Sequence, residues 1–261
     1  MSETFQPVVL EMSAASIGAL RDTSHVVVAD VNWSVAAGEF WVVAGQQQSG
    51  KSDLLMHAAG LMTPLQGSCR VFGCETRDFG EAQIAERLRV GFVFAGGKLF
   101  NQLTVAENIS LPLRYQSHHN LPEISSRTVA LLEWLELTPF ADSTPASLAA
   151  NWRQRVALAR ALALQPELLL LDQPLGGLGT RHRQWLLQFL DQLWRGHELS
   201  GGRPMTIVAT TDDLRAWPHP QRKFAVLDRK TFSVLGAWDD VKSAPHHAVK
   251  ELLAEPVETT I

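Results

Sequence analysis

The sequence predicts an α/β fold with a largely parallel sheet, an antiparallel β layer ahead of it and an inserted helical segment. Three observations lead to this prediction. The apolar run 40–43 is followed by a tight loop and then an amphipathic segment. A second apolar run ends in an acid, Asp172, as expected of a parallel strand covered on both faces. Between them, from Thr104 to Ala163, apolar residues recur with a helical period.

The N-terminal part is rich in β-forming residues at 8–12 and 25–35. Val31, Trp33 and Val35 alternate with polar residues, which is the pattern of a half-solvated antiparallel strand. The pair Ala37-Gly38 then predicts a turn. An antiparallel layer is therefore expected before the loop.

The loop itself reads Gly45-Gln46-Gln47-Gln48-Ser49-Gly50-Lys51-Ser52 and precedes a predicted helix at 53–62. A strand, a loop of the form G-x-x-x-x-G-K-[ST] and a helix form the context of a phosphate-binding loop. Backbone amides, the positive end of the helix and the Lys51 ammonium converge there on one small volume. The sequence therefore predicts a site for the phosphates of a nucleotide, with Ser52 as a Mg²⁺ ligand.

The middle of the chain contains a turn at 63–67, a strand at 68–72 and a buried strand at 88–94 that ends at Ala95. The helical texture that follows predicts a helical subdomain at about 96–163, inserted into a single domain that spans residues 1–261.

Sheet character returns with the strand 168–171. Thr180 is expected to cap a helix whose apolar stripe packs against the sheet. Strands are predicted at 205–209 and 224–227, and a closing helix at 244–253.

Composition excludes several classes of function. The net charge of −4 and the lack of a long basic block argue against nucleic acid as a partner. No apolar stretch approaches the roughly 20 residues of a membrane-spanning helix, and no secretory signal is recognised, so a cytosolic protein is expected. Cys69 and Cys74 are interpreted as reduced structural thiols, and the pairs His118-His119 and His246-His247 as solvated surface residues.

Two further stretches carry a family resemblance. Both are similar to segments of the nucleotide-binding subunits of ABC transporters. They read Thr104-Val105-Ala106-Glu107-Asn108-Ile109 and Arg153-Gln154-Arg155-Val156-Ala157-Leu158-Ala159-Arg160-Ala161-Leu162, the latter followed by Pro166-Glu167-Leu168. The resemblance extends from about residue 8 to about 240. It implies a P-loop NTPase core of the ABC ATPase type, a Walker A loop at 45–52, and ATP and Mg²⁺ as cofactors. It also implies that Asp172 joins Ser52 in holding Mg²⁺.

Five functional positions depart from the family pattern. The signature Leu-Ser-Gly-Gly-Gln is replaced by Leu148-Ala149-Ala150-Asn151-Trp152, so its hydroxyl and two glycines are lost. Four single positions also differ: Gln173 for the glutamate that polarises water, Thr211 for the histidine at the γ-phosphate, Ala95 for a glutamine and Gly179 for an aspartate. Since Gln173 cannot accept a proton at neutral pH, the resemblance implies a degenerate pseudo-ATPase.

Nucleotide binding is predicted to be weak. Asp53 stands where the family has a threonine near the α-phosphate, and two like charges about 5 Å apart at a dielectric of about 20 repel by roughly 3 kcal/mol before screening. Asp53 also suits a helix N-terminus. Where the family stacks an aromatic ring on adenine, this chain offers Ile17 or His25.

Three functions are compatible with these residues. The first is a degenerate nucleotide-binding subunit on the cytosolic face of a membrane, which binds a transmembrane transporter subunit and an identical or paralogous second nucleotide-binding subunit. The stretch 236–240 resembles the ATPase subunits of Mla-type lipid-trafficking transporters. The second function is a scaffold that needs no nucleotide, and the third is an active ATPase completed by its partner.

Overall fold

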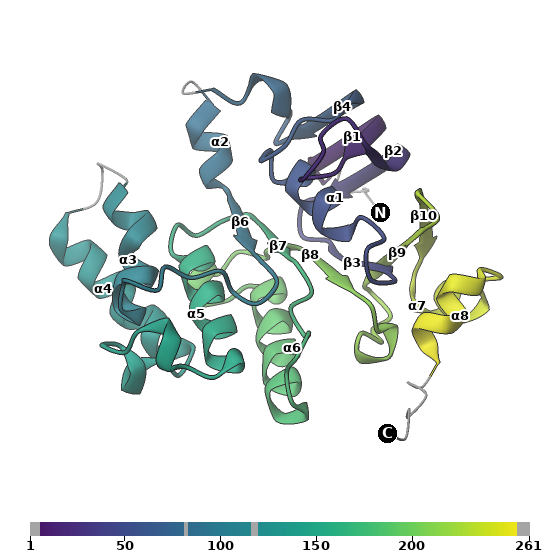
Figure 1. The fold of residues 1–261 in the computed structure, drawn as a ribbon. Coiled ribbons are helices and arrows are strands. Elements are labelled where there is room, and N and C mark those ends of the chain that lie inside the picture. Colours follow the sequence, from purple (N-terminus) through teal and green to yellow (C-terminus); the bar gives the residue numbers. More distant parts are fainter. Residues whose placement is uncertain (1–5, 81–82, 116–119, 255–261) are drawn as a thin grey trace, which may run out of the picture. The chain divides into compact units, whose positions relative to one another are not determined.

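The computed structural model describes residues 6–80, 83–115 and 120–254 (Figure 1). The chain divides into two compact units. Unit 1 contains residues 36–38 and 79–207 with a short N-terminal stretch, and unit 2 contains residues 8–35, 39–78 and those from 208 onward. The predicted helical subdomain lies within unit 1, and its independence as a subdomain stays a prediction.

Unit 2 is built on a mixed sheet. Its strands follow the order β5-β4-β1-β2-β10-β9-β3, in which β1 pairs antiparallel with β4 and β3 pairs parallel with β9. The strands are β1 (Val8–Gly18), β2 (Val26–Ala36), β3 (Phe40–Gly45), β4 (Gln66–Val71), β5 (Cys74–Glu75), β9 (Lys223–Asp228) and β10 (Thr231–Gly236). The parallel register from Trp41 opposite Lys223 to Gly45 opposite Leu227 brings the carboxyl ends of β3 and β9 together. That edge is where the phosphate-binding loop begins.

The helices of unit 2 are short. They are α1 (Lys51–Ala58), α7 (Trp238–Ser243) and α8 (His247–Leu253), with 3₁₀ turns η1 (Thr76–Asp78) and η6 (Leu214–Ala216). α1 packs on β1, β3 and β4, whereas α8 packs on β3, β9 and η6. α7 and α8 are drawn in yellow in Figure 1, at the C-terminal end of the described chain.

Unit 1 combines two parallel strands, β6 (Val90–Val93) and β7 (Leu168–Leu171), with most of the helices. All four residues of β7 are buried, as the apolar run predicted. The helices are α2 (Ile84–Leu88), α3 (Val105–Tyr115), α4 (Leu121–Trp134), α5 (Ala150–Leu162) and α6 (Thr180–Arg195), with 3₁₀ turns η3 (Thr138–Phe140), η4 (Pro145–Ser147) and η5 (Glu198–Ser200). α3 packs against α4 and α5. β8 (Thr206–Thr211) begins in unit 1 and ends in unit 2.

Side-chain caps explain where two of these helices begin. Before α3, Thr104 Oγ1 accepts a hydrogen bond from the Glu107 amide at 3.2 Å, and Glu107 Oε2 accepts one from the Thr104 amide at 2.8 Å. Asn120 and Glu123 make the same reciprocal pair at the start of α4.

Several predicted boundaries were wrong. The helix expected at 53–62 ends at Ala58, and Gly60 follows with a positive φ of 66°. The strand expected at 88–94 covers 90–93, because Leu88 belongs to α2. Thr180 does not cap α6: it is the first helical residue, and Gly179 is the cap. The short elements α2, β5, α7 and β10 were not predicted.

Candidate functional site

The loop between β3 and α1 contains the predicted phosphate-binding motif. β3 is buried throughout and ends at Gly45, and α1 begins at Lys51. Gly50, at the N-cap of α1, has a φ of 94°, where a side chain would be strained. A Cβ there would lie 2.9 Å from Val28 Cγ2, and one at Gly45 would lie 2.5 Å from Ser49 Oγ. Both glycines of the motif are therefore required by the geometry.

Lys51 is held inside this loop. Its side chain is buried, and Nζ donates hydrogen bonds of 2.6 Å to the carbonyl oxygens of Gly45 and Gln46. Ser49 Oγ lies 3.4 Å from the same nitrogen. The ammonium is thus positioned by the backbone of the loop it would serve, while Ser52 is exposed at the start of α1.

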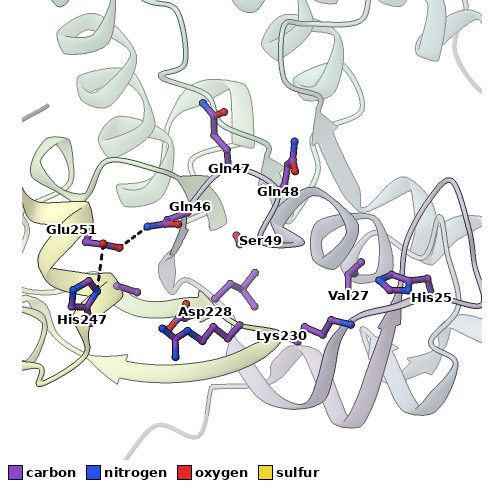
Figure 2. Close-up of a pocket in the computed structure, with 13 residues that line it drawn as sticks. His25, Val27, Gln46, Gln47, Gln48, Ser49, Asp228, Lys230, His247 and Glu251 are labelled. Atoms are coloured by element: carbon purple, nitrogen blue, oxygen red, sulfur yellow. Dashed lines mark hydrogen bonds and ion pairs between the residues drawn. The ribbon is translucent and has the colours of Figure 1, made fainter. Parts of the chain in front are cut away.

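A pocket of about 590 Å³ opens beside the loop, and all of its lining belongs to unit 2 (Figure 2). Three kinds of segment surround it: the loop, the strand ends on either side, and α8. The lining residues are His25, Val27, Gln46, Gln47, Gln48, Ser49, Leu227, Asp228, Arg229, Lys230, His247, Ala248 and Glu251. A group bound there would meet the loop on one side and both acidic and basic side chains on the others.

Asp53 takes part in a hydrogen bond that the sequence did not reveal. Its Oδ1 accepts a hydrogen bond of 2.9 Å from the backbone amide of Leu20, which follows β1. The same carboxylate lies in the first turn of α1, where a negative charge is favourable. Asp53 therefore stabilises the loop region of unit 2, whatever its effect on a bound phosphate.

The two candidates for the base-stacking position are now distinguished. Ile17 is completely buried in the core, whereas His25 is exposed and lines the pocket. Of the two, His25 is the ring that a ligand in this pocket would contact.

The wall of the pocket formed by α8 comes from residues that no sequence motif identified. Glu251 of α8 accepts a hydrogen bond of 2.5 Å from Gln46 Nε2, and His247 Nδ1 lies 3.4 Å from Glu251 Oε1 (Figure 2). His247 belongs to a pair interpreted as surface residues, and it is exposed but lines the pocket. His118 and His119 lie outside the described residues. No local signal could have found these contacts, because Gln46 and Glu251 are 205 positions apart.

The acidic end of the second apolar run lies in unit 1. Asp172 follows β7 and is buried, and its amide donates a hydrogen bond of 2.8 Å to the Val93 carbonyl of the neighbouring strand. Gln173 comes next with a positive φ of 45°, and its carbonyl accepts a hydrogen bond from the Gly176 amide at 3.0 Å. The strand thus ends in a tight turn, with both residues at its carboxyl end.

The segment that replaces the signature is packed against α6. Ala149 is the N-cap of α5, and the side chains of Asn151 and His182 lie 2.7 Å apart. The Trp152 ring contacts Phe140 at a centroid distance of 4.7 Å and His182 at 6.0 Å. Asn151 and Trp152 are therefore engaged in contacts within unit 1.

The remaining changed positions are short side chains. Thr211 is buried at the end of β8, where Oγ1 accepts from the Asp213 amide at 3.0 Å and donates to the Asp213 carbonyl at 2.9 Å. Ala95 follows β6, and Gly179 caps α6. The Thr211 hydroxyl is therefore committed to a local turn.

The two cysteines are thiols of the sheet region in unit 2. Cys69 and Cys74 are free, and burial raises the pKa of the Cys69 thiol to about 12. Among the described residues, no cluster of three or more His, Cys, Asp or Glu side chains could hold a metal ion. Within the same ranges, no helix combines the length and apolar character needed to cross a membrane.

Comparison with known proteins agrees with this architecture. A family model described as ABC transporter matches residues 28–176. The sulfate/thiosulfate import ATP-binding protein CysA of Nephroselmis olivacea is 35% identical over 91% of this chain and 65% of its own length. A protein of the same name from Agrobacterium fabrum is 36% identical over 83% of this chain and 61% of its own length. The chain thus spans less than two thirds of the length of these relatives.

Solved structures give the same result. A dimeric ATP-binding cassette in a post-hydrolysis state, bound to ADP and Pi, matches with a TM-score of 0.74 and 27% identity over 85% of this chain and 95% of that chain. CbiO1 from Clostridium perfringens, part of the ABC transporter complex CbiONQ, matches with a TM-score of 0.75 over 94% of this chain and 92% of its own, and at 21% identity it supports the fold. None of these proteins is named as a Mla-type subunit, so that finer resemblance stays a prediction.

Proposed function

The chain belongs to the ABC transporter family, and on that premise we propose that it is the nucleotide-binding subunit of an ABC-type membrane transporter. The observation that carries the proposal is the loop 45–52, whose two required glycines and buried Lys51 form a cradle for phosphate. The substrate named for the relatives is not carried over, because they extend well beyond this chain.

Partners and place in the cell follow from the same premise. The helical part of unit 1 would receive a coupling helix from a transmembrane transporter subunit, and a second nucleotide-binding subunit, identical or paralogous, would form a dimer with this one. The chain would then lie on the cytosolic face of the membrane. A single-domain organisation over residues 1–261 belongs to this proposal.

ATP is the nucleotide proposed for the site. Backbone amides of residues 46–50 would bind its phosphates together with Lys51, and His25 would face its base. Ser52 and Asp172 carry the hard oxygen ligands that Mg²⁺ prefers, and they would hold the ion. When bound, Mg²⁺ neutralises charge on the phosphates.

Hydrolysis is proposed to be impaired or absent. Gln173 is an amide and cannot accept a proton from water at neutral pH. The Thr211 hydroxyl is already used in a turn with Asp213, and a short side chain cannot replace an imidazole. With Asn151 and Trp152 packed against α6 residues, the segment 148–152 also offers a partner's nucleotide neither a serine hydroxyl nor glycine backbone.

An equilibrium titration tests whether nucleotide is bound. The full chain is titrated with ATP in a calorimeter, with and without Mg²⁺, beside Lys51→Ala and the matched control Lys242→Ala. Lys242 is an exposed lysine of α7 outside the pocket. The proposal expects measurable binding by the unmodified chain and by Lys242→Ala, and about a tenfold or greater loss in Lys51→Ala, since a charged hydrogen-bond partner contributes about 1.5–3 kcal/mol.

Other outcomes favour the alternatives. If the chain binds no ATP, or if Lys51→Ala binds ATP as well as the unmodified chain does, the proposal is contradicted and a scaffold that needs no nucleotide is favoured. Hydrolysis that appears only when a partner subunit is added would favour an ATPase completed by that partner.

A further inference from the structure

The C-terminal helix α8 makes a direct contact with the phosphate-binding loop. Glu251 of α8 lines the pocket beside the loop, and its carboxylate accepts the 2.5 Å hydrogen bond from Gln46 Nε2 (Figure 2). Gln46 is the residue that directly follows Gly45, and its carbonyl also accepts a hydrogen bond from Lys51. One end of the loop is thus joined by a hydrogen bond between two side chains to a residue 205 positions away.

The helix is oriented by its apolar side. Ala248, Val249 and Leu252 are buried, and α8 packs on β3, β9 and η6 within unit 2. The opposite side presents His247 and Glu251 to the pocket, and both are exposed. A seven-residue helix held by three apolar side chains is a small element, and elements with few buried contacts open locally at a lower free-energy cost than the core.

We propose that α8 is a latch on the phosphate-binding loop, in which the Glu251 carboxylate occupies the pocket as an internal anion and competes with the polyphosphate of a bound nucleotide. This inference rests on the proposed function, since it concerns regulation of the same site.

Electrostatics give the direction of the effect. Binding of a polyphosphate brings several negative charges into a pocket that already contains Glu251 and Asp228. Like charges in one partly solvated pocket repel, and salt and the basic groups Arg229 and Lys230 reduce this repulsion without removing it. ATP therefore binds best when α8 has moved away, and by reciprocity ATP weakens the contact between Glu251 and Gln46.

Two substitutions separate the charge from the contact. Glu251→Gln removes the charge but keeps a carbonyl oxygen that can accept from Gln46, whereas Glu251→Ala removes both. Asp78→Asn is the matched control, because it changes net charge equally at an exposed carboxylate of unit 2 outside the pocket. In calorimetric titrations of the full chain, Glu251→Gln is expected to bind ATP about two- to tenfold more tightly than the unmodified chain. This is the change in affinity expected when one screened charge near a polyphosphate is removed. Glu251→Ala is expected to gain at least as much, and Asp78→Asn to bind as the unmodified chain does.

Hydrogen exchange provides a second measurement on the unmodified chain. Saturating ATP is expected to speed amide exchange in residues 247–253, whereas Lys51→Ala at the same ATP concentration should show no such change. Equal ATP affinity in the unmodified chain, Glu251→Gln and Glu251→Ala, or weaker binding in Glu251→Gln, would overturn the latch.

The two proposals fail in different ways. If Lys51→Ala abolishes binding and Glu251→Gln leaves it unchanged, the nucleotide site stands and the latch is wrong. If neither the unmodified chain nor Glu251→Gln binds ATP in a manner that depends on Lys51, the proposed function is contradicted and the latch falls with it.

Discussion

Asp53 has two effects that act in opposite directions. Its negative charge stands in the first turn of α1, beside the proposed phosphate site, and would repel a nucleotide. Its Oδ1 also accepts the hydrogen bond from the Leu20 amide, which ties α1 to the chain after β1. The first effect concerns ligand affinity and the second concerns folding, so different substitutions can separate them.

Asp53→Asn and Asp53→Thr make this separation. Asn keeps an acceptor oxygen in the place of Oδ1, whereas the Thr hydroxyl is one bond shorter and cannot reach the Leu20 amide. Both are expected to bind ATP up to about tenfold more tightly, because about 1.4 kcal/mol of relieved repulsion corresponds to a tenfold gain in affinity. Only Asp53→Thr is expected to lose stability, by about 1 kcal/mol, the net contribution of one hydrogen bond. Calorimetry and urea unfolding measure the two effects.

The charge argument is wrong if neither variant gains affinity. The structural role of Asp53 is wrong if both variants unfold at the same urea concentration as the unmodified chain.

His57 is a buried titratable group within α1. Its ring is completely buried, Nδ1 donates a 2.8 Å hydrogen bond to the Asp53 carbonyl, and burial lowers its pKa below the ordinary 6.5. Between the lowered folded pKa and 6.5 the unfolded chain binds more protons than the folded one. The free energy of unfolding should therefore fall as the pH drops through 6.5, with a slope of at most about 1.4 kcal/mol per pH unit from this one group.

His57→Gln provides the comparison, because it does not titrate and its amide can donate to the Asp53 carbonyl. Urea unfolding at pH 7.5, 6.5 and 5.5 is expected to show a steeper loss for the unmodified chain than for the variant. Parallel losses would assign the pH dependence to other groups, of which His197, whose pKa is also lowered by burial, is one.

Residues within the loop could be predicted from the sequence because the phosphate-binding geometry constrains residue type at each position. Gly45 and Gly50 stand where a Cβ would clash, and Lys51 is held inside the loop, whereas their role in binding a nucleotide stays a prediction. Glu251 could not be predicted, since its contact with Gln46 depends on how α8 packs on the sheet and not on any local pattern.

At the scale of elements, the helices of unit 1 meet around one buried cation. The Arg155 guanidinium of α5 is 3.5 Å from the centroid of the Trp185 ring of α6 and 4.7 Å from that of Trp152. It donates to Glu136 Oε2 at 2.6 Å and to the Leu135 carbonyl at 3.1 Å. Two of the eight Trp residues of the chain thus serve to position a structural arginine.

Arg155→Ala and Glu136→Gln should differ in their effect on stability. The side chain of Arg155 is 7% exposed and that of Glu136 is 59% exposed. Loss of the guanidinium leaves the Leu135 carbonyl unpaired and removes the contacts with two rings, which is expected to lower the free energy of unfolding by about 2–4 kcal/mol. Glu136→Gln should lower it by no more than about 1 kcal/mol, as for an exposed ion pair.

Chemical denaturation of the full chain followed by circular dichroism gives both values. Equal losses in the two variants would show that the ion pair, and not the packing of the guanidinium between the rings, stabilises this junction.

Elements with weak local signals account for most errors of the sequence-based prediction. β9 and β10 form a hairpin whose turn residues, Arg229 and Lys230, have positive φ values of 45° and 67°. Such turns are usually marked by Asn or Gly, so nothing indicated that the chain reverses here. α2 buries none of its residues and therefore shows no helical period. β3 and β7 were predicted correctly because their runs of buried apolar residues leave few alternatives.

At the scale of the whole molecule, the proposed function separates two tasks. In that proposal the loop 45–52 would hold phosphate, whereas Gln173, Thr211 and the segment 148–152 would lack the groups that cut the terminal phosphate. The fold class and family could be predicted because the motifs occur in the required order along the chain. The consequence of the substitutions for activity depends on chemistry and has to be measured.

A single-turnover experiment tests this separation most directly. The purified chain is mixed in excess with radiolabelled Mg·ATP, and bound nucleotide and released phosphate are followed together, with Lys51→Ala as the control. We expect ATP to be retained in a manner that depends on Lys51 and to be recovered intact. Release of phosphate that is rapid in the unmodified chain and abolished in Lys51→Ala would contradict the proposal that binding persists without hydrolysis.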